Sequence, residues 1–200
     1  MSYITNVTHF LDEDGYPVHS GPVGRIGEFF GKIVAAASLH PQGEVVPSAL
    51  RCRRRPGRKP CRGNLLIARR DDGVIEWQCP LCGDDGFIHS WEGTYWDRGK
   101  YAIPDLASED IIEFTVTEDE FKELMKPMIL SPESEAILYS AILIEEAVEL
   151  RAAFESFEEF MGEIAFEANH TDNRRREVIL AQVCKRIDTL LSFHNIVRDF

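Results

Sequence analysis

Four cysteines in the first half of the chain constrain the fold more than any other feature. Cys79 and Cys82 belong to the run Cys79-Pro80-Leu81-Cys82-Gly83, and eight residues separate Cys52 from Cys61 upstream. Proline fixes its own φ and glycine tolerates positive φ, so this run predicts a tight turn that directs both sulfurs at one point. Four thiolates complete the tetrahedral coordination of Zn²⁺ and leave no position for water. The sequence therefore predicts a closed, structural zinc site.

The long upstream spacing makes Cys52 the weakest of the four ligand candidates, and His89 is the reserve. The alternative is four buried or disulfide-linked cysteines without a metal. The N-terminus lacks the basic start and apolar run of a signal peptide, and the longest apolar stretch, near 136–144, is too short to span a bilayer. We therefore expect a cytoplasmic protein, in which reducing conditions favour thiolate–metal bonds over disulfides.

The segment around the cysteines has the pattern of short strands. Strands are predicted at 64–69 and 74–78 with a turn at 70–73 between them, and a third strand is predicted at 86–91. Two metal-binding turns beside a three-stranded antiparallel sheet resemble the zinc-ribbon family, and the Cys-Pro-Leu-Cys-Gly run carries that resemblance. The aromatic residues here are expected to pack on the sheet, with base stacking as the alternative: Trp77, Trp91, Tyr95 and Trp96.

The flanking segments suggest an α+β protein in three parts. An N-terminal strand and helix segment (1–48) ends in a linker at 39–50 that contains two prolines and a glycine. A small antiparallel zinc-ribbon-like domain (49–98) follows. The acidic C-terminal domain (107–200) is expected to be mainly helical, because capping signals and apolar periodicity recur along it.

Charge is divided unevenly along the chain. The net charge is −12, yet residues 51–70 hold nine Lys or Arg and no acid, and residues 105–167 hold eighteen Asp or Glu against three basic residues. The six cations nearest the first two cysteines are candidates for phosphate or partner contact: Arg53, Arg54, Arg55, Arg58, Lys59 and Arg62. They could offset the charge of the zinc centre, dock on acidic protein surface of this or a sister chain, or bind nucleic-acid phosphates.

One acidic group has the spacing of a catalytic metal site. Glu163, Glu167 and His170 would share one helix face, and Glu-x-x-His pairs build di-iron sites. Such sites need a second pair, which the sequence lacks, so a metal-dependent enzyme in the acidic half is only an alternative. We assign no catalytic residue.

Beyond the zinc segment, the chain resembles a group of uncharacterised bacterial proteins without an established activity. The matching stretches are 4–12, 52–57, 77–83, 167–170 and 173–176. The resemblance implies a zinc-binding, cytoplasmic bacterial protein. Together these observations predict a non-enzymatic zinc protein that serves as a macromolecular interaction or regulatory module. A protein is the expected partner and nucleic acid, bound through the arginine-rich loop, is the second choice.

Overall fold

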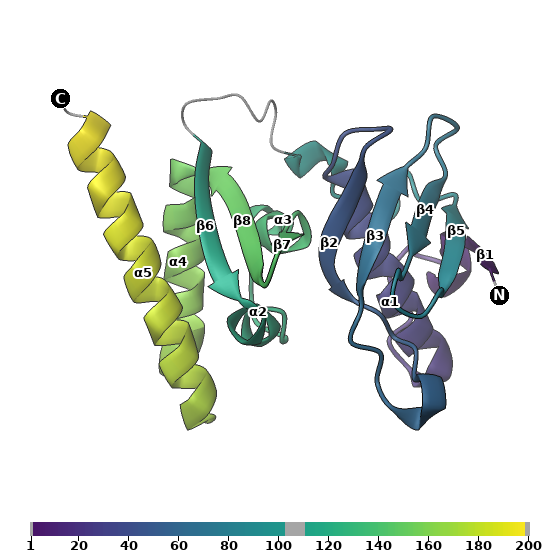
Figure 1. The fold of residues 1–200 in the computed structure, drawn as a ribbon, viewed down its shortest axis with the longest axis horizontal. Coiled ribbons are helices and arrows are strands. Elements are labelled where there is room, and N and C mark those ends of the chain that lie inside the picture. Colours follow the sequence, from purple (N-terminus) through teal and green to yellow (C-terminus); the bar gives the residue numbers. More distant parts are fainter. Residues whose placement is uncertain (1, 103–110, 199–200) are drawn as a thin grey trace. The chain divides into compact units, whose positions relative to one another are not determined.

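The structure, a computed structural model, describes residues 2–102 and 111–198. The chain forms two compact units, residues 1–102 and 103–200 (Figure 1). Among the described residues, no helix combines the length and apolar character needed to cross a membrane.

The first unit contains a five-stranded mixed sheet with the order β1-β5-β4-β3-β2. Its strands are β1 (Ser2–Asn6), β2 (Val45–Arg51), β3 (Asn64–Arg69), β4 (Ile75–Gln78) and β5 (Asp85–His89). Strand β1 runs parallel to β5, and the other neighbours are antiparallel. One α-helix, α1 (Gly21–Ser38), contacts this sheet, and three short 3-10 turns lie at η1 (Val7–Phe10), η2 (Pro56–Arg58) and η3 (Gly99–Tyr101).

The core of this unit lies between α1 and the sheet. Alternation along β3 and β4 buries Leu65, Ile67, Ile75 and Trp77 while their neighbours in sequence are more exposed. Helix α1 contributes a buried face that includes Phe30 and Ile33. Trp91 and Trp96 are also buried, so the tryptophans serve packing and offer no stacking surface, whereas Tyr95 is 45% exposed.

The second unit contains a three-stranded antiparallel sheet and four helices in its described part. The strand order is β7-β8-β6, with β6 at Ile111–Thr117, β7 at Ile142–Ile144 and β8 at Ala147–Ala153. The helices are α2 (Glu118–Leu124), α3 (Pro132–Tyr139), α4 (Phe154–His170) and α5 (Arg174–Arg198).

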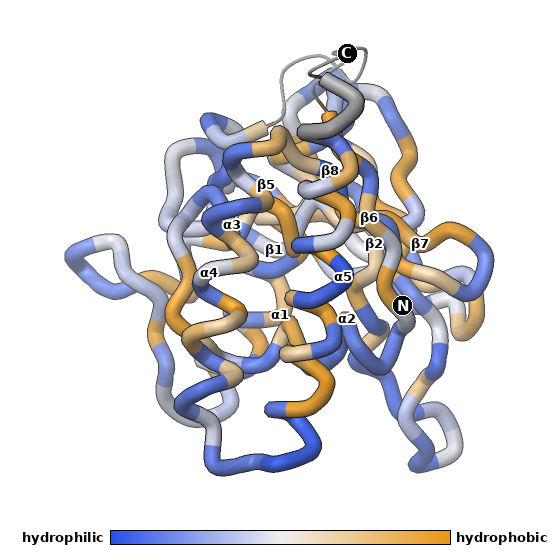
Figure 2. The backbone as a smooth tube through the Cα atoms, turned by 90° about the vertical axis from the view of Figure 1, so that its left-hand side faces the viewer, coloured by the Kyte–Doolittle hydropathy of each residue, from blue (hydrophilic) through white to orange (hydrophobic). Residues whose placement is uncertain are grey.

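The long helices of this unit pack on each other through apolar stripes. Phe157, Phe160 and Ile164 of α4 are fully buried, as are Leu180 and Val183 of α5. The hydropathy colouring alternates along the helical segments, as expected for helices with one buried face (Figure 2).

The predicted fold class is wrong in two respects. The cysteine-rich strands do not form a small separate antiparallel ribbon, because β1 and β2 from the N-terminal segment belong to the same mixed sheet. The expectation of a mostly helical C-terminal domain is also wrong, because β6, β7 and β8 form an antiparallel sheet within it. The expected linker at 39–50 contains most of β2.

Candidate metal centre

The four cysteines meet at one end of the first sheet. Strand β2 ends at Arg51 and is followed at once by Cys52, and Cys61 lies just before β3 begins. Cys79 follows β4 and Cys82 precedes β5. These four strands are antiparallel neighbours. The same end of the sheet therefore carries the end of β2, the start of β3, the end of β4 and the start of β5. Topology therefore brings together cysteines that are far apart in sequence.

Two backbone loops hold the sulfur atoms. Residues 53–62, which we call the strap, leave the β2–β3 hairpin and return to it, closed by the bond from Cys61 N to Arg54 O (2.8 Å) (Figure 1). Residues 79–83, which we call the knuckle, are closed by the bond from Gly83 N to Cys79 O (2.9 Å), and Gly83 has the positive φ of +68° that the turn requires.

The spacing of the sulfur atoms fits a tetrahedral metal site. The Sγ atoms of Cys52 and Cys82 lie 3.6 Å apart, and those of Cys61 and Cys79 lie 3.8 Å apart. All four lie within 4.8 Å of one another, and all four cysteines are free of disulfides. A zinc–sulfur bond of about 2.3 Å gives a tetrahedron with edges of about 3.8 Å, whereas a disulfide would need about 2.05 Å. The four cysteines could therefore hold one metal ion.

Backbone N–H groups and burial set the electrostatics of the cluster. Arg54 N and Gly63 N donate to the sulfurs of Cys52 and Cys61, each at 3.4 Å. Burial raises the pKa of the Cys52 and Cys79 thiols, whereas the Gly63 N–H lowers the pKa of Cys61. Buried thiols without a cation favour the protonated form, and a bound divalent metal supplies the charge that stabilises the thiolates.

Gly63 is a part of the site that sequence analysis missed. A Cβ atom at this position would lie 2.6 Å from Cys79 Sγ and 2.8 Å from Leu81 Cβ. Only glycine lets the strap approach the knuckle this closely. The signal in the sequence was a glycine two residues after Cys61, comparable to Gly83 directly after Cys82.

Two of the predicted contact arginines contact other parts of the unit and anchor the strap: Arg53 is half-buried, whereas the Arg54 side chain is 51% exposed. The Arg53 guanidinium lies 5.0 Å from the ring centroids of Tyr3 and Phe29 and 5.5 Å from that of Phe30. Arg54 forms an ion pair with the buried Asp84 (3.5 Å), whose carboxyl pKa is raised by burial. These arginines therefore fix the strap to β1, α1 and Asp84, which directly follows the knuckle, a role that sequence analysis did not assign.

The other four predicted contact residues face outward. Arg55, Arg58, Lys59 and Arg62 are exposed. Within the described part of the chain, none of their side chains has an ion pair or a hydrogen bond. An open groove of about 770 Å³ lies beside the cysteine cluster and is lined by Pro56, Lys59, Pro60, Cys61, Arg62, Leu81 and Cys82.

The remaining metal candidates are not assembled into a site. His89, the reserve ligand, is exposed at the end of β5 and is not part of the cysteine cluster. Cys184 bonds weakly to Met161 O at 3.7 Å, and burial raises its pKa to about 11. It behaves as a packed thiol of the second unit.

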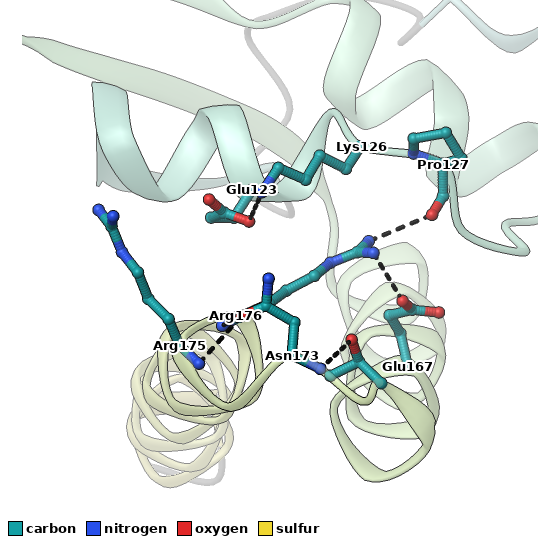
Figure 3. Close-up of polar contacts among 8 residues, drawn as sticks. Glu123, Lys126, Pro127, Glu167, Asn173, Arg175 and Arg176 are labelled. Atoms are coloured by element: carbon teal, nitrogen blue, oxygen red, sulfur yellow. Dashed lines mark hydrogen bonds and ion pairs between the residues drawn. The ribbon is translucent and has the colours of Figure 1, made fainter.

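The three residues of the alternative acidic site are each engaged separately. Glu163 accepts from Ser131 N at 2.8 Å, and Glu167 pairs with Arg176 at 2.8 Å. Figure 3 shows Arg176 between Glu167 and the Pro127 carbonyl, which it reaches at 3.2 Å. His170 Nδ1 contacts Phe166 O of its own helix at 2.7 Å. Among the described residues, the cysteine group is the only cluster with metal-site geometry.

Comparison with protein families, with curated proteins and with solved structures found no match. The resemblance to an uncharacterised bacterial family therefore stays a prediction.

Proposed function

We propose that residues 1–102 form a structural zinc-binding module, and that this module binds a macromolecular partner through the outward face of the strap. The metal has no catalytic role in this proposal, because four thiolates leave no open coordination position. One observation carries it. The cysteine cluster closes both ends of a strap that presents four cations without partners among the described residues.

Zinc is the metal that the donor set favours. Tetrahedral four-sulfur sites select zinc or iron, and zinc is the usual ion of a structural site formed from two turns. The N–H groups of Arg54 and Gly63 already point at two of the sulfurs, which is the support that thiolate ligands need.

An extended anionic surface is the partner that the strap fits best. Arg55, Arg58, Lys59 and Arg62 spread along eight residues of chain, and two of them, Lys59 and Arg62, line the groove. Arg53, through its contact with the Tyr3 ring, and Arg54, through its ion pair with Asp84, hold the strap in place. A loop fixed in this way loses little conformational entropy on binding, which favours recognition.

The proposal is tested by metal analysis and by a strap variant. Purified chain is expected to contain about one zinc per molecule. A variant with Arg55→Gln, Arg58→Gln, Lys59→Gln and Arg62→Gln should keep that zinc, because none of the four side chains contacts a ligand sulfur. The wild-type chain should retain a macromolecule from extract that the variant does not, and the complex should re-form from purified components. Zinc-free chain, or a complex unaffected by the variant, would contradict the proposal.

A further inference from the structure

We infer that the partner of the strap is a nucleic acid, which is bound through its phosphate backbone along the groove beside the metal centre. This inference rests on the proposed function and specifies its ligand.

The groove is lined by positive charges that suit binding of phosphate groups. Lys59 and Arg62 line it, and Arg55 and Arg58 are exposed on the same strap. Three of the four cations are arginines, whose planar guanidinium can bind a phosphate with two parallel hydrogen bonds. The groove volume of about 770 Å³ is far more than one phosphate or carboxylate fills, so the groove has room for more than one phosphate of a chain.

The groove lacks the aromatic side chains that are typical of protein interfaces. Binding energy between proteins is concentrated in buried aromatic and apolar anchors. Here the three tryptophans of the unit are at most 8% exposed, and the apolar side chains that line the groove are Pro56, Pro60 and Leu81. Phosphate contact needs only positioned cations, so the chemistry favours nucleic acid over an acidic protein.

The strap has few side chains for reading bases. Residues 53–62 consist of arginine, lysine, proline, glycine and cysteine, without the Asn or Gln that read adenine. Arginine can contact guanine, but the buried tryptophans provide no stacking platform. We therefore expect phosphate contacts to dominate the affinity and any sequence preference to be limited to guanine.

The backbone of the strap is strained at its tip. Arg58 has a φ of +67° directly after Gly57 at +60°, a backbone region that residues other than glycine rarely adopt. The bonds Arg58 N to Arg55 O (3.0 Å) and Lys59 N to Pro56 O (3.2 Å) hold this turn. The turn leaves Arg58 and Lys59 exposed at the tip of the strap.

Fluorescence anisotropy on the full zinc-loaded chain tests the inference. The probes are a labelled mixed-sequence DNA duplex, a labelled oligo-dT strand and labelled poly-glutamate. Four phosphate contacts predict a slope of log K against log salt of about −3.6 for the duplex, or roughly a hundredfold weaker binding for a fourfold rise in salt. The variant Lys59→Gln/Arg62→Gln should reduce the slope by about 2.

A second double variant removes the same charge elsewhere in the unit. Arg70 lies in the β3–β4 turn and Lys100 in η3, and both are exposed. Arg70→Gln/Lys100→Gln should keep the wild-type slope, and both variants should keep their zinc. Equal losses in the two variants would overturn the inference. Binding of poly-glutamate without binding of either nucleic acid would also overturn it, but would leave the proposed function intact. Failure of all three probes at low salt overturns the inference, and the extract experiment then decides the proposed function.

Discussion

Gly63 is the residue on which the close approach of strap and knuckle depends. In the variant Gly63→Ala the new Cβ would press on Cys79 Sγ and Leu81 Cβ, at 2.6 Å and 2.8 Å. The knuckle has to move, because Leu81 Cβ is fixed to the backbone and Cys79 Sγ is held in the cysteine cluster. We expect zinc affinity to fall by roughly 10- to 100-fold, the range found when support for metal ligands is lost. Competition with a chromogenic chelator measures this change.

The matched control for this substitution is Gly162→Ala. Gly162 lies within α4 of the second unit, and a Cβ there meets nothing within 4 Å. Alanine should stabilise that helix by about 0.5–1 kcal/mol without any change in zinc affinity. If Gly63→Ala bound zinc with wild-type affinity, the prediction would be wrong. The four sulfurs would then still bind the metal when the Cβ pushes Cys79 away from its place in the structure.

Arg53 provides a second prediction at the scale of one residue. Its guanidinium lies over three aromatic rings, so Arg53→Ala removes both the cation–π contacts and the packing of the side-chain stem. We expect the free energy of unfolding of the first unit to fall by about 2 kcal/mol. Urea unfolding followed by tryptophan fluorescence reports on this unit, because all three tryptophans lie in it.

The exposed neighbour Arg55 separates this effect from a general loss of charge. Arg55→Ala should change the free energy of unfolding by less than about 0.5 kcal/mol, as is usual for surface positions. An equal effect at both positions would mean that the aromatic contacts of Arg53 contribute nothing to stability.

Residue identity alone was enough to predict a cluster of four cysteines but not the contacts that support it. Cysteine spacing indicated all four sulfurs, because four thiolates with knuckle spacing are typical of a tetrahedral metal site. The aromatic contacts of Arg53 could not be predicted, because Tyr3 and Phe29 reach it only through the pairing of β1 with β5 and the packing of α1. Those contacts depend on the whole sheet.

At the scale of elements, strand β2 shows why a local pattern can mislead. Pro47 lies inside β2, opposite Leu66, although proline cannot donate to a strand ladder. The pairing with β3 shifts register between Pro47 and Arg51, and an irregular strand tolerates proline at such a point. By contrast, the helix-capping signals at Thr117 and Ser131 depend only on residues close in sequence. Helices α2 and α3 begin directly after these two residues, as expected.

The capping box of α2 gives a pH-dependent prediction. Burial alone would raise the carboxyl pKa of Glu120, but hydrogen bonds from Thr117 N (2.8 Å) and Arg186 (2.7 Å) outweigh it and lower the pKa. A carboxyl with a lowered folded-state pKa stabilises the fold above its unfolded pKa, and this contribution is lost as pH falls through the folded value. Glu120→Gln should therefore cost about 1 kcal/mol at neutral pH.

The difference between wild type and Glu120→Gln should narrow below about pH 4.5 and vanish in stronger acid. Urea unfolding monitored by helical circular dichroism across pH measures it. Glu159→Gln, at an exposed position of α4, is the matched control and should follow wild type at every pH. A constant difference between the Glu120 variant and wild type would show that the charge of Glu120 is not what stabilises the cap.

At the scale of the whole molecule, charge follows the division into units. Residues 1–102 contain thirteen Lys or Arg and twelve Asp or Glu, whereas residues 103–200 contain nine and twenty-two. The first unit is therefore nearly neutral and the second carries −13, so the net charge of the whole chain conceals the cationic strap. Exposed charges that lie farther apart than the Debye length, about 10 Å at 0.1 M salt, are largely screened from one another. The strap can therefore attract anions locally although the whole chain is acidic.

Removal of the metal should affect the two units differently. The cysteine cluster belongs to the first unit, and each unit has its own buried core. Structural zinc contributes folding free energy directly, so a strong chelator should lower the melting temperature reported by tryptophan fluorescence by at least about 10 °C. Helical circular dichroism comes largely from α2 to α5, and the melting temperature of its main transition should not change.

Cys79→Ser should reproduce the shift without chelator, whereas Cys184→Ser should not. A common shift of both transitions would mean that the units unfold together, and no shift in fluorescence would mean that the cluster does not stabilise the first unit through a metal.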